Sequence, residues 1–146
     1  MRSSHLQGGH VTSSMSQNYK LLIVDDEPGV TLTLKLIFER EGYQVTPAYT
    51  CAEALQLFRD GHGFDGVITD LNMEREDIGL EVVRAAQQIE PRPAIVICTG
   101  YANGGNAQAA LDMKVDYLAT KPVDLQQLLH SLEMIMRRRY VQRARA

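Results

Sequence analysis

Charged and hydroxyl side chains stand just after four short apolar runs in the sequence. Asp25 and Asp26 follow the first run, Asp70 the second, Thr99 the third and Lys121 the fourth. Three carboxylates held together without partners repel one another, which raises the pKa of at least one of them. A divalent cation removes this repulsion. Mg²⁺ fits best, because it takes oxygen ligands in octahedral geometry and commonly bridges carboxylates to a phosphoryl group.

The same side chains could carry out phosphoryl chemistry. The ammonium group of Lys121 would meet phosphoryl oxygens as a point charge, and Thr99 could donate a hydrogen bond to them. A carboxylate in such a site can itself accept the phosphoryl group and form an acyl phosphate. Singly, each of these side chains could be an ordinary turn, cap or surface residue. The chemistry requires that their chain segments meet at one place.

The apolar runs are typical of strands that are covered on both faces, because they are short and continuous rather than alternating. The predicted strands, of which the second is the weakest, span residues 21–24, 43–46, 66–69, 94–98 and 115–118.

Stretches of helical periodicity lie between these runs and after the last one. The predicted apolar faces span residues 30–38, 51–58, 82–89, 107–111 and 125–136. Thr50 and Glu53 form a capping box before the second helix, and Asp124 with Gln127 can cap the fifth.

Strand and helix therefore alternate five times along the chain. This alternation predicts an α/β fold with a doubly wound parallel sheet, right-handed crossovers and helices on both faces. Ligands bind such sheets at the carboxyl ends of the strands, near the point where the strand order reverses. All the candidate side chains stand at those ends, so we expect them to converge there.

Composition and charge describe one ordinary domain with a distinct segment at either end. The chain has 146 residues, 45% of them hydrophobic, and a net charge of −3. Five of the 15 basic residues lie within residues 137–146, which contain none of the 18 acidic residues. Residues 1–18 are rich in Ser and Gly, and we expect a flexible leader or a remnant of an expression tag there.

Several classes of partner are not expected. No apolar run approaches the ~20 residues that a membrane helix needs. Direct nucleic-acid binding by the basic tail is not expected, because the sequence shows no helix-turn-helix module to position it. Cys51 and Cys98 are predicted to be small buried residues rather than a disulfide, which favours a reducing cytoplasm.

Four segments together resemble the receiver domain of two-component response regulators, the CheY-like family. They are Leu22–Pro28 (LIVDDEP), Ile68–Met73 (ITDLNM), Cys98–Ala102 (CTGYA) and Thr120–Pro122 (TKP). Asp26, Asp70, Thr99 and Lys121 follow one another at intervals of 44, 29 and 22 positions. The resemblance implies a flavodoxin-like (βα)5 domain over residues 19–136, with strand order 2-1-3-4-5. Residues 137–146 would then form a basic helical extension or linker.

The family pattern also implies a role for each matching residue. Asp70 would be the phosphoacceptor, Thr99 the switch hydroxyl, and Lys121 the partner of the phosphoryl group ahead of a cis bond to Pro122. The implied ligands of Mg²⁺ are Asp25, Asp26, Asp70 and the backbone carbonyl of Asn72.

Two regions depart from the family pattern. The segment 74–79 (EREDIG) lacks the usual Pro and has one extra residue, so Glu74 or Glu76 could add negative charge near the phosphoryl group. The family often places a switch aromatic three residues before the site Lys, where this sequence has Leu118 and the aromatic Tyr117 is one residue earlier. We expect Tyr101 to take over part of that role.

The resemblance implies a signalling switch rather than an enzyme, catalysing only its own phosphoryl transfer and dephosphorylation. A sensor histidine kinase or histidine phosphotransfer protein would phosphorylate Asp70, and the surface formed by residues 103–136 would rearrange. The basic tail would lead to an output domain after residue 146, or would support a homodimer through the last strand and helices.

Alternative functions are a phosphorylation-independent binding scaffold, an aspartyl phosphatase and a fold that binds a flavin or a dinucleotide. The intact acidic pair, Asp70, Thr99 and Lys121 argue against the scaffold. Asn72 argues against the phosphatase, because it stands where a second Asp would act as general acid. The sequence Asp-Asp-Glu-Pro after the first strand argues against nucleotide binding, which needs a glycine-rich loop there.

Overall fold

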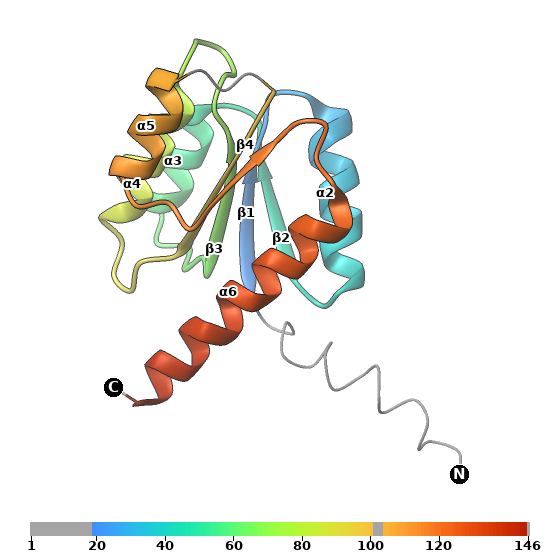
Figure 1. The fold of residues 1–146 in the computed structure, drawn as a ribbon, viewed down its shortest axis with the longest axis vertical. Coiled ribbons are helices and arrows are strands. Elements are labelled where there is room, and N and C mark those ends of the chain that lie inside the picture. The colour runs from blue at the N-terminus through green and yellow to red at the C-terminus, as the bar shows by residue number, and fades with distance from the viewer. Residues whose placement is uncertain (1–18, 101–103, 146) are drawn as a thin grey trace.

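The computed structural model describes residues 19–100 and 104–145, which form alternating strands and helices (Figure 1). The strands are β1 (Lys20–Val24), β2 (Gln44–Ala48), β3 (Gly66–Asp70), β4 (Ala94–Thr99) and β5 (Tyr117–Thr120). The helices are α2 (Pro28–Arg40), α3 (Cys51–Arg59), α4 (Gly79–Gln87), α5 (Gly104–Asp112) and α6 (Leu125–Arg145).

All five strands join one parallel sheet in the order β2-β1-β3-β4-β5. This confirms the doubly wound α/β fold and the strand order that the sequence predicts. The order reverses at β1, which lies between β2 and β3. The carboxyl ends of β1 and β3 therefore meet at the topological switch point, where such sheets bind ligands.

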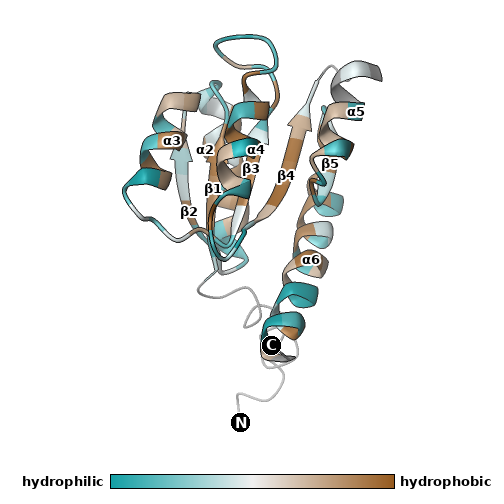
Figure 2. Ribbon diagram, turned by 90° about the vertical axis from the view of Figure 1, so that its left-hand side faces the viewer, coloured by the Kyte–Doolittle hydropathy of each residue, from teal (hydrophilic) through white to brown (hydrophobic). Residues whose placement is uncertain are grey.

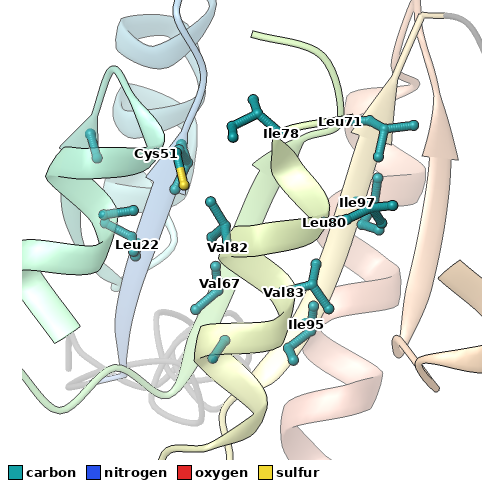
Figure 3. Close-up of a cluster of buried hydrophobic side chains, with 14 of the residues drawn as sticks. Leu22, Cys51, Val67, Leu71, Ile78, Leu80, Val82, Val83, Ile95 and Ile97 are labelled. Carbon is teal, nitrogen blue, oxygen red and sulfur yellow. The ribbon is translucent and has the colours of Figure 1, made fainter. Parts of the chain in front are cut away.

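Helices cover both faces of the sheet, with α2 and α6 on one side and α3, α4 and α5 on the other (Figure 1). Successive strand residues point to opposite faces. Leu22, Val67 and Ile95 pack against α3 and α4 (Figure 3), whereas Ile23 and Ile68 pack against α2 and α6. Because both faces are buried, the central strands are apolar along most of their length, as their colours in Figure 2 show.

Side-chain caps begin two of the helices as the sequence predicts. The Thr50 hydroxyl accepts a hydrogen bond from the Glu53 amide at 3.1 Å, and the Asp124 carboxylate accepts one from the Gln127 amide at 3.0 Å. The Glu53 carboxylate accepts from the amide of Tyr49, one residue before the position that a capping box uses.

The last strand begins two residues later than predicted, at Tyr117 rather than Val115. A turn occupies the preceding residues, with Lys114 in the left-handed region at φ 59°. The Asp116 amide donates to the Ile95 carbonyl at 2.8 Å, and the Asp116 carboxylate accepts from the Ile95 amide at 2.8 Å. Asp116 therefore joins the turn to the start of β4, and regular pairing begins after it.

Helix α2 buries most of its predicted apolar face and adds Thr31 to it. Thr31, Leu34 and Phe38 are its buried residues, whereas Val30 and Ile37 are only half-buried. Thr31 is tolerated in the core because its hydroxyl donates to the carbonyl of Asp25 at 3.1 Å.

Helix α6 continues past residue 136 through most of the basic tail and reaches the amino-terminal edge of the sheet. The Arg143 guanidinium lies 3.7 Å from the Asp65 carboxylate, which also accepts a hydrogen bond from the Lys20 amide at 2.8 Å. Burial lowers the pKa of Arg139 from its usual value, against the opposing effect of Asp116. No described helix is long and apolar enough to cross a membrane.

Gly79 is required by close packing at the start of α4. A Cβ atom there would lie 2.0 Å from the carbonyl oxygen of Asp70 and 2.8 Å from the Cα atom of Leu71. The Gly79 amide donates to the Leu71 carbonyl at 2.8 Å, which draws the two ends of the β3–α4 loop together.

We predict that Gly79→Ala lowers the free energy of unfolding by about 1–3 kcal/mol, because backbone atoms must move to admit the methyl group. Gly63→Ala is the matched control, since a Cβ atom at that position meets no atom within 4 Å. Urea unfolding followed by circular dichroism measures both variants. Equal stability of the two variants would contradict the packing argument.

Candidate functional site

Three carboxylates from two neighbouring strands meet at the carboxyl edge of the sheet. Asp25 and Asp26 follow β1 directly, and Asp70 is the last residue of β3. One carboxylate oxygen from each lies within 4.8 Å of the others. Asp25 and Asp70 are buried and Asp26 is exposed. Strand order explains the convergence, because β1 and β3 are adjacent and parallel.

Lys121 joins this cluster from the loop after β5. Its ammonium group lies 3.0 Å from the Asp25 carboxylate, 3.3 Å from that of Asp70 and 4.0 Å from that of Glu27. The Lys121 amide donates to the Thr99 carbonyl at 2.7 Å, so a backbone bond holds the loop beside β4. The peptide bond between Lys121 and Pro122 is cis.

Burial and neighbouring charges set the titration of the cluster. Burial raises the pKa of Asp70 above its usual value, Lys121 opposes this rise and the Asp25 charge adds to it. Burial alone would lower the pKa of Lys121, but its hydrogen bond to Asp25 and the charges of Asp70 and Asp25 raise it overall. The charged form of Lys121 is therefore stabilised in the site. The ionised form of Asp70 is disfavoured, and additional positive charge nearby would stabilise it.

Backbone groups hold the two buried carboxylates in place. One oxygen of Asp25 accepts from the amide of Glu27 at 2.9 Å, and one oxygen of Asp70 accepts from the amide of Leu71 at 2.7 Å. The amide of Asp25 donates to the carbonyl of Ala48 at 3.1 Å, which ties the end of β1 to the end of β2. The carboxylates are thus oriented before any ligand binds.

The donor set fits a hard divalent cation. Asp25, Asp26 and Asp70 offer only oxygen atoms, and their combined charge exceeds that of Lys121. Burial, with a smaller contribution from the Asp25 charge, raises the pKa of Asp70, and a cation bound beside it would favour the ionised carboxylate. A cavity of about 760 Å³ opens beside these side chains, with Ile23 and Ile68 in its wall.

The predicted switch residues lie in different environments. Thr99 is buried at the end of β4, directly opposite Thr120 of β5. Leu118 packs on the side of the sheet that α3 and α4 cover, whereas Tyr117 packs on the α2 and α6 side. Tyr101 lies outside the described residues.

Sequence reasoning missed three contacts around this site. It did not identify Thr31, although a polar residue within the predicted apolar face at residues 30–38 was an available signal. It did not identify Glu27, although this residue adjoins the acidic pair. It also left the role of Glu74 open, and the Glu74 carboxylate accepts a hydrogen bond from the Cys51 amide at 3.1 Å. Nothing in the sequence links those two positions, which are 23 residues apart.

Solved receiver domains share this architecture. The response regulator receiver domain protein (CheY-like) from Methanospirillum hungatei JF-1 matches 85% of this chain and 98% of its own, with 27% identity and a TM-score of 0.79. Response regulator TrrA from Thermotoga maritima, solved in complex with Mg²⁺-BeF, matches 80% of this chain and 97% of its own, with 28% identity and a TM-score of 0.68.

Curated relatives and a family comparison agree with the structural matches. The transcriptional regulatory protein GlrR of Escherichia coli is 34% identical over 77% of this chain and 25% of its own length. The response regulator ArlR of Staphylococcus aureus is 32% identical over 82% of this chain and 53% of its own length. The chain thus spans a quarter to about half the length of these relatives. The sequence model of the response regulator receiver domain matches residues 21–133, so this chain belongs to the response regulator receiver domain family.

Proposed function

We propose that the chain is a phosphorylation switch in which Asp70 accepts a phosphoryl group in the presence of Mg²⁺. The observation that carries the proposal is the cluster of three carboxylates within 4.8 Å of one another, two of which contact Lys121. Thr99, at the end of the neighbouring strand, would supply the switch hydroxyl.

The donor would be a phosphohistidine of a sensor histidine kinase or histidine phosphotransfer protein. An oxygen of Asp70 forms a bond to phosphorus while the bond from phosphorus to the histidine nitrogen breaks, and the electron pair of that bond stays on the nitrogen. Asp25, Asp26, Asp70 and the backbone carbonyl of Asn72 would hold Mg²⁺. The ion supplies charge neutralisation for the phosphoryl oxygens. Lys121, whose ammonium group contacts both Asp25 and Asp70, would pair with the same oxygens.

The readout would begin at the new charge on Asp70. A phosphoryl group adds roughly −1.5 to −2 charges, and this charge attracts the Lys121 ammonium and the Thr99 hydroxyl. Residues 103–136 carry the loop, strand and helices next to those two side chains, so they form the surface that changes its partners. Leu118 and Tyr117 belong to that surface, and we propose Tyr101 as a further switch residue.

An output domain after residue 146 is the partner we favour for this surface. The printed names of the relatives include a transcriptional regulatory protein, and this chain spans only part of their length. Residues 19–136 would be the receiver domain and residues 137–146 the link to the output domain, in a cytoplasmic protein. A homodimer through β5 and the adjoining helices is the alternative use of the same surface.

Intact mass spectrometry after incubation with acetyl phosphate and Mg²⁺ tests the proposal. We expect one phosphoryl adduct on the wild-type chain and none on Asp70→Asn or without metal, because the acceptor or its charge neutralisation is then missing. Asp60→Asn, an exposed substitution outside the site, should retain the adduct. A folded wild-type chain that takes no adduct under any condition would instead support the phosphorylation-independent scaffold.

The stability of the metal-free chain should reflect the cost of burying the ionised Asp70 carboxylate next to Asp25. The raised pKa of Asp70 means that its ionised form is less favourable in the folded chain than in the unfolded chain. This penalty is fully present above the folded pKa and is absent below the unfolded value of 3.8. Asp70→Asn should therefore stabilise the metal-free protein at pH 7, and the gain should vanish as the pH falls toward 3.8.

Urea unfolding in EDTA at several pH values measures this effect, with Asp60→Asn as the control for removing a surface charge. Adding Mg²⁺ should raise the unfolding midpoint of the wild-type chain more than that of Asp70→Asn. An ion that binds the folded state stabilises it, and the variant has lost one of the carboxylates that would hold the ion. A destabilised Asp70→Asn at pH 7 would show that attraction to Lys121 outweighs burial and repulsion.

A further inference from the structure

The β3–α4 loop, residues 71–78, folds back on itself directly beside Asp70. Its two ends meet where the Gly79 amide bonds the Leu71 carbonyl, against the backbone of Asp70. Within the loop, the Asn72 side-chain oxygen accepts from the Asp77 amide at 2.7 Å. Asp77 takes the left-handed conformation at φ 60°. The base of the loop is therefore fixed to the sheet edge, and its tip extends away from it.

Glu74 joins the tip of this loop to a different element. Its carboxylate accepts a hydrogen bond from the amide of Cys51 at 3.1 Å. Cys51 is the first residue of α3, where an amide has no partner within the helix and the helix dipole favours a negative charge. Figure 3 shows Cys51 in the same buried cluster as Ile78, at the other end of the loop. The hydrogen bond therefore holds the tip of the loop against the start of α3.

The bond also connects the two parts of the proposed metal site. The amide of Asp25 is bonded to the carbonyl of Ala48, at the end of β2. Cys51 follows Ala48 by three positions, and its amide is bonded to Glu74, two positions after Asn72. A continuous path of short turns and hydrogen bonds therefore links the acidic pair after β1 to the backbone of Asn72 after β3.

We propose that Glu74 is a positioning residue that holds the loop so that the Asn72 carbonyl faces the metal site. This inference rests on the proposed function, in which that carbonyl is a ligand of Mg²⁺. Glu74 acts on metal affinity through the Cys51 amide and does not touch the phosphoryl group. Without its hydrogen bond the loop tip is free to move, and binding must then order it at a cost in affinity.

Mg²⁺ affinity of Glu74 variants tests the proposal. Isothermal titration with Mg²⁺ should show about three- to tenfold weaker binding for Glu74→Ala, the effect of losing one hydrogen bond of ordinary net strength. Glu74→Gln keeps an acceptor oxygen and should recover part of the affinity. At saturating Mg²⁺ all variants should react with acetyl phosphate at the wild-type rate, because Asp70 and Lys121 are unchanged.

Glu76→Ala is the matched control, since Glu76 is an exposed glutamate of the same loop that makes no side-chain hydrogen bond or ion pair within the described residues. It removes the same charge and should bind Mg²⁺ as the wild-type chain does. Circular dichroism checks that each variant is folded.

Cys51→Pro removes the amide donor instead of the acceptor. Proline is well tolerated at the first position of a helix, and the extended backbone of Thr50 suits a residue that precedes proline. If Glu74 acts through this amide, Cys51→Pro should weaken Mg²⁺ binding to a similar extent, and the double variant should be no weaker than either single one.

The outcomes separate this inference from the function on which it rests. A wild-type chain that takes no phosphoryl adduct overturns the proposed function. A wild-type chain that is phosphorylated, with Glu74→Ala binding Mg²⁺ as tightly as Glu76→Ala, overturns the role of Glu74 alone. Fully additive effects of Glu74→Ala and Cys51→Pro likewise overturn it, because the two groups would then act independently.

Discussion

Repulsion among the three carboxylates at the sheet edge is the constraint on which the rest of the structure depends. The parallel sheet creates this repulsion by bringing the ends of β1 and β3 together, and it also supplies the partial remedy, Lys121, from the end of β5. One ammonium group between two buried carboxylates leaves negative charge uncompensated. The site therefore carries an excess of negative charge, which a bound cation would offset.

A rigid platform is needed to keep such a cluster together. The central strands are buried on both faces, and the backbone at each strand end is tied to a neighbour. Asp25 is bonded through its amide to Ala48, Lys121 to Thr99, and Gly79 to Leu71. The first two bonds join positions that are distant in the sequence, and the third closes the loop between β3 and α4. Hydrophobic packing on the two faces thus supplies the free energy that offsets the cost of holding like charges together.

Much of this arrangement could be predicted from the sequence because its signals are local. Continuous apolar runs indicated doubly covered strands, and the capping residues Thr50 and Asp124 marked helix starts. The predicted start of β5 was wrong because valine is common in strands, which made Val115 look like a strand residue. A long-range hydrogen bond between Asp116 and Ile95 instead holds this part of the chain in a turn. The contact between Glu74 and Cys51 left no local signal, since either residue alone is ordinary at its position.

The course of α6 has a mechanical consequence. A helix of 21 residues is about 30 Å long, and this one begins just after the loop that carries Lys121 and ends beside Asp65, at the opposite edge of the sheet. By geometry, a tilt of about 10° of a rigid rod of this length would displace its far end by about 5 Å. The ion pair between Arg143 and Asp65 lies at that far end. A half-exposed pair of this kind stabilises by at most about 1 kcal/mol, so it would hold the end of the helix only weakly.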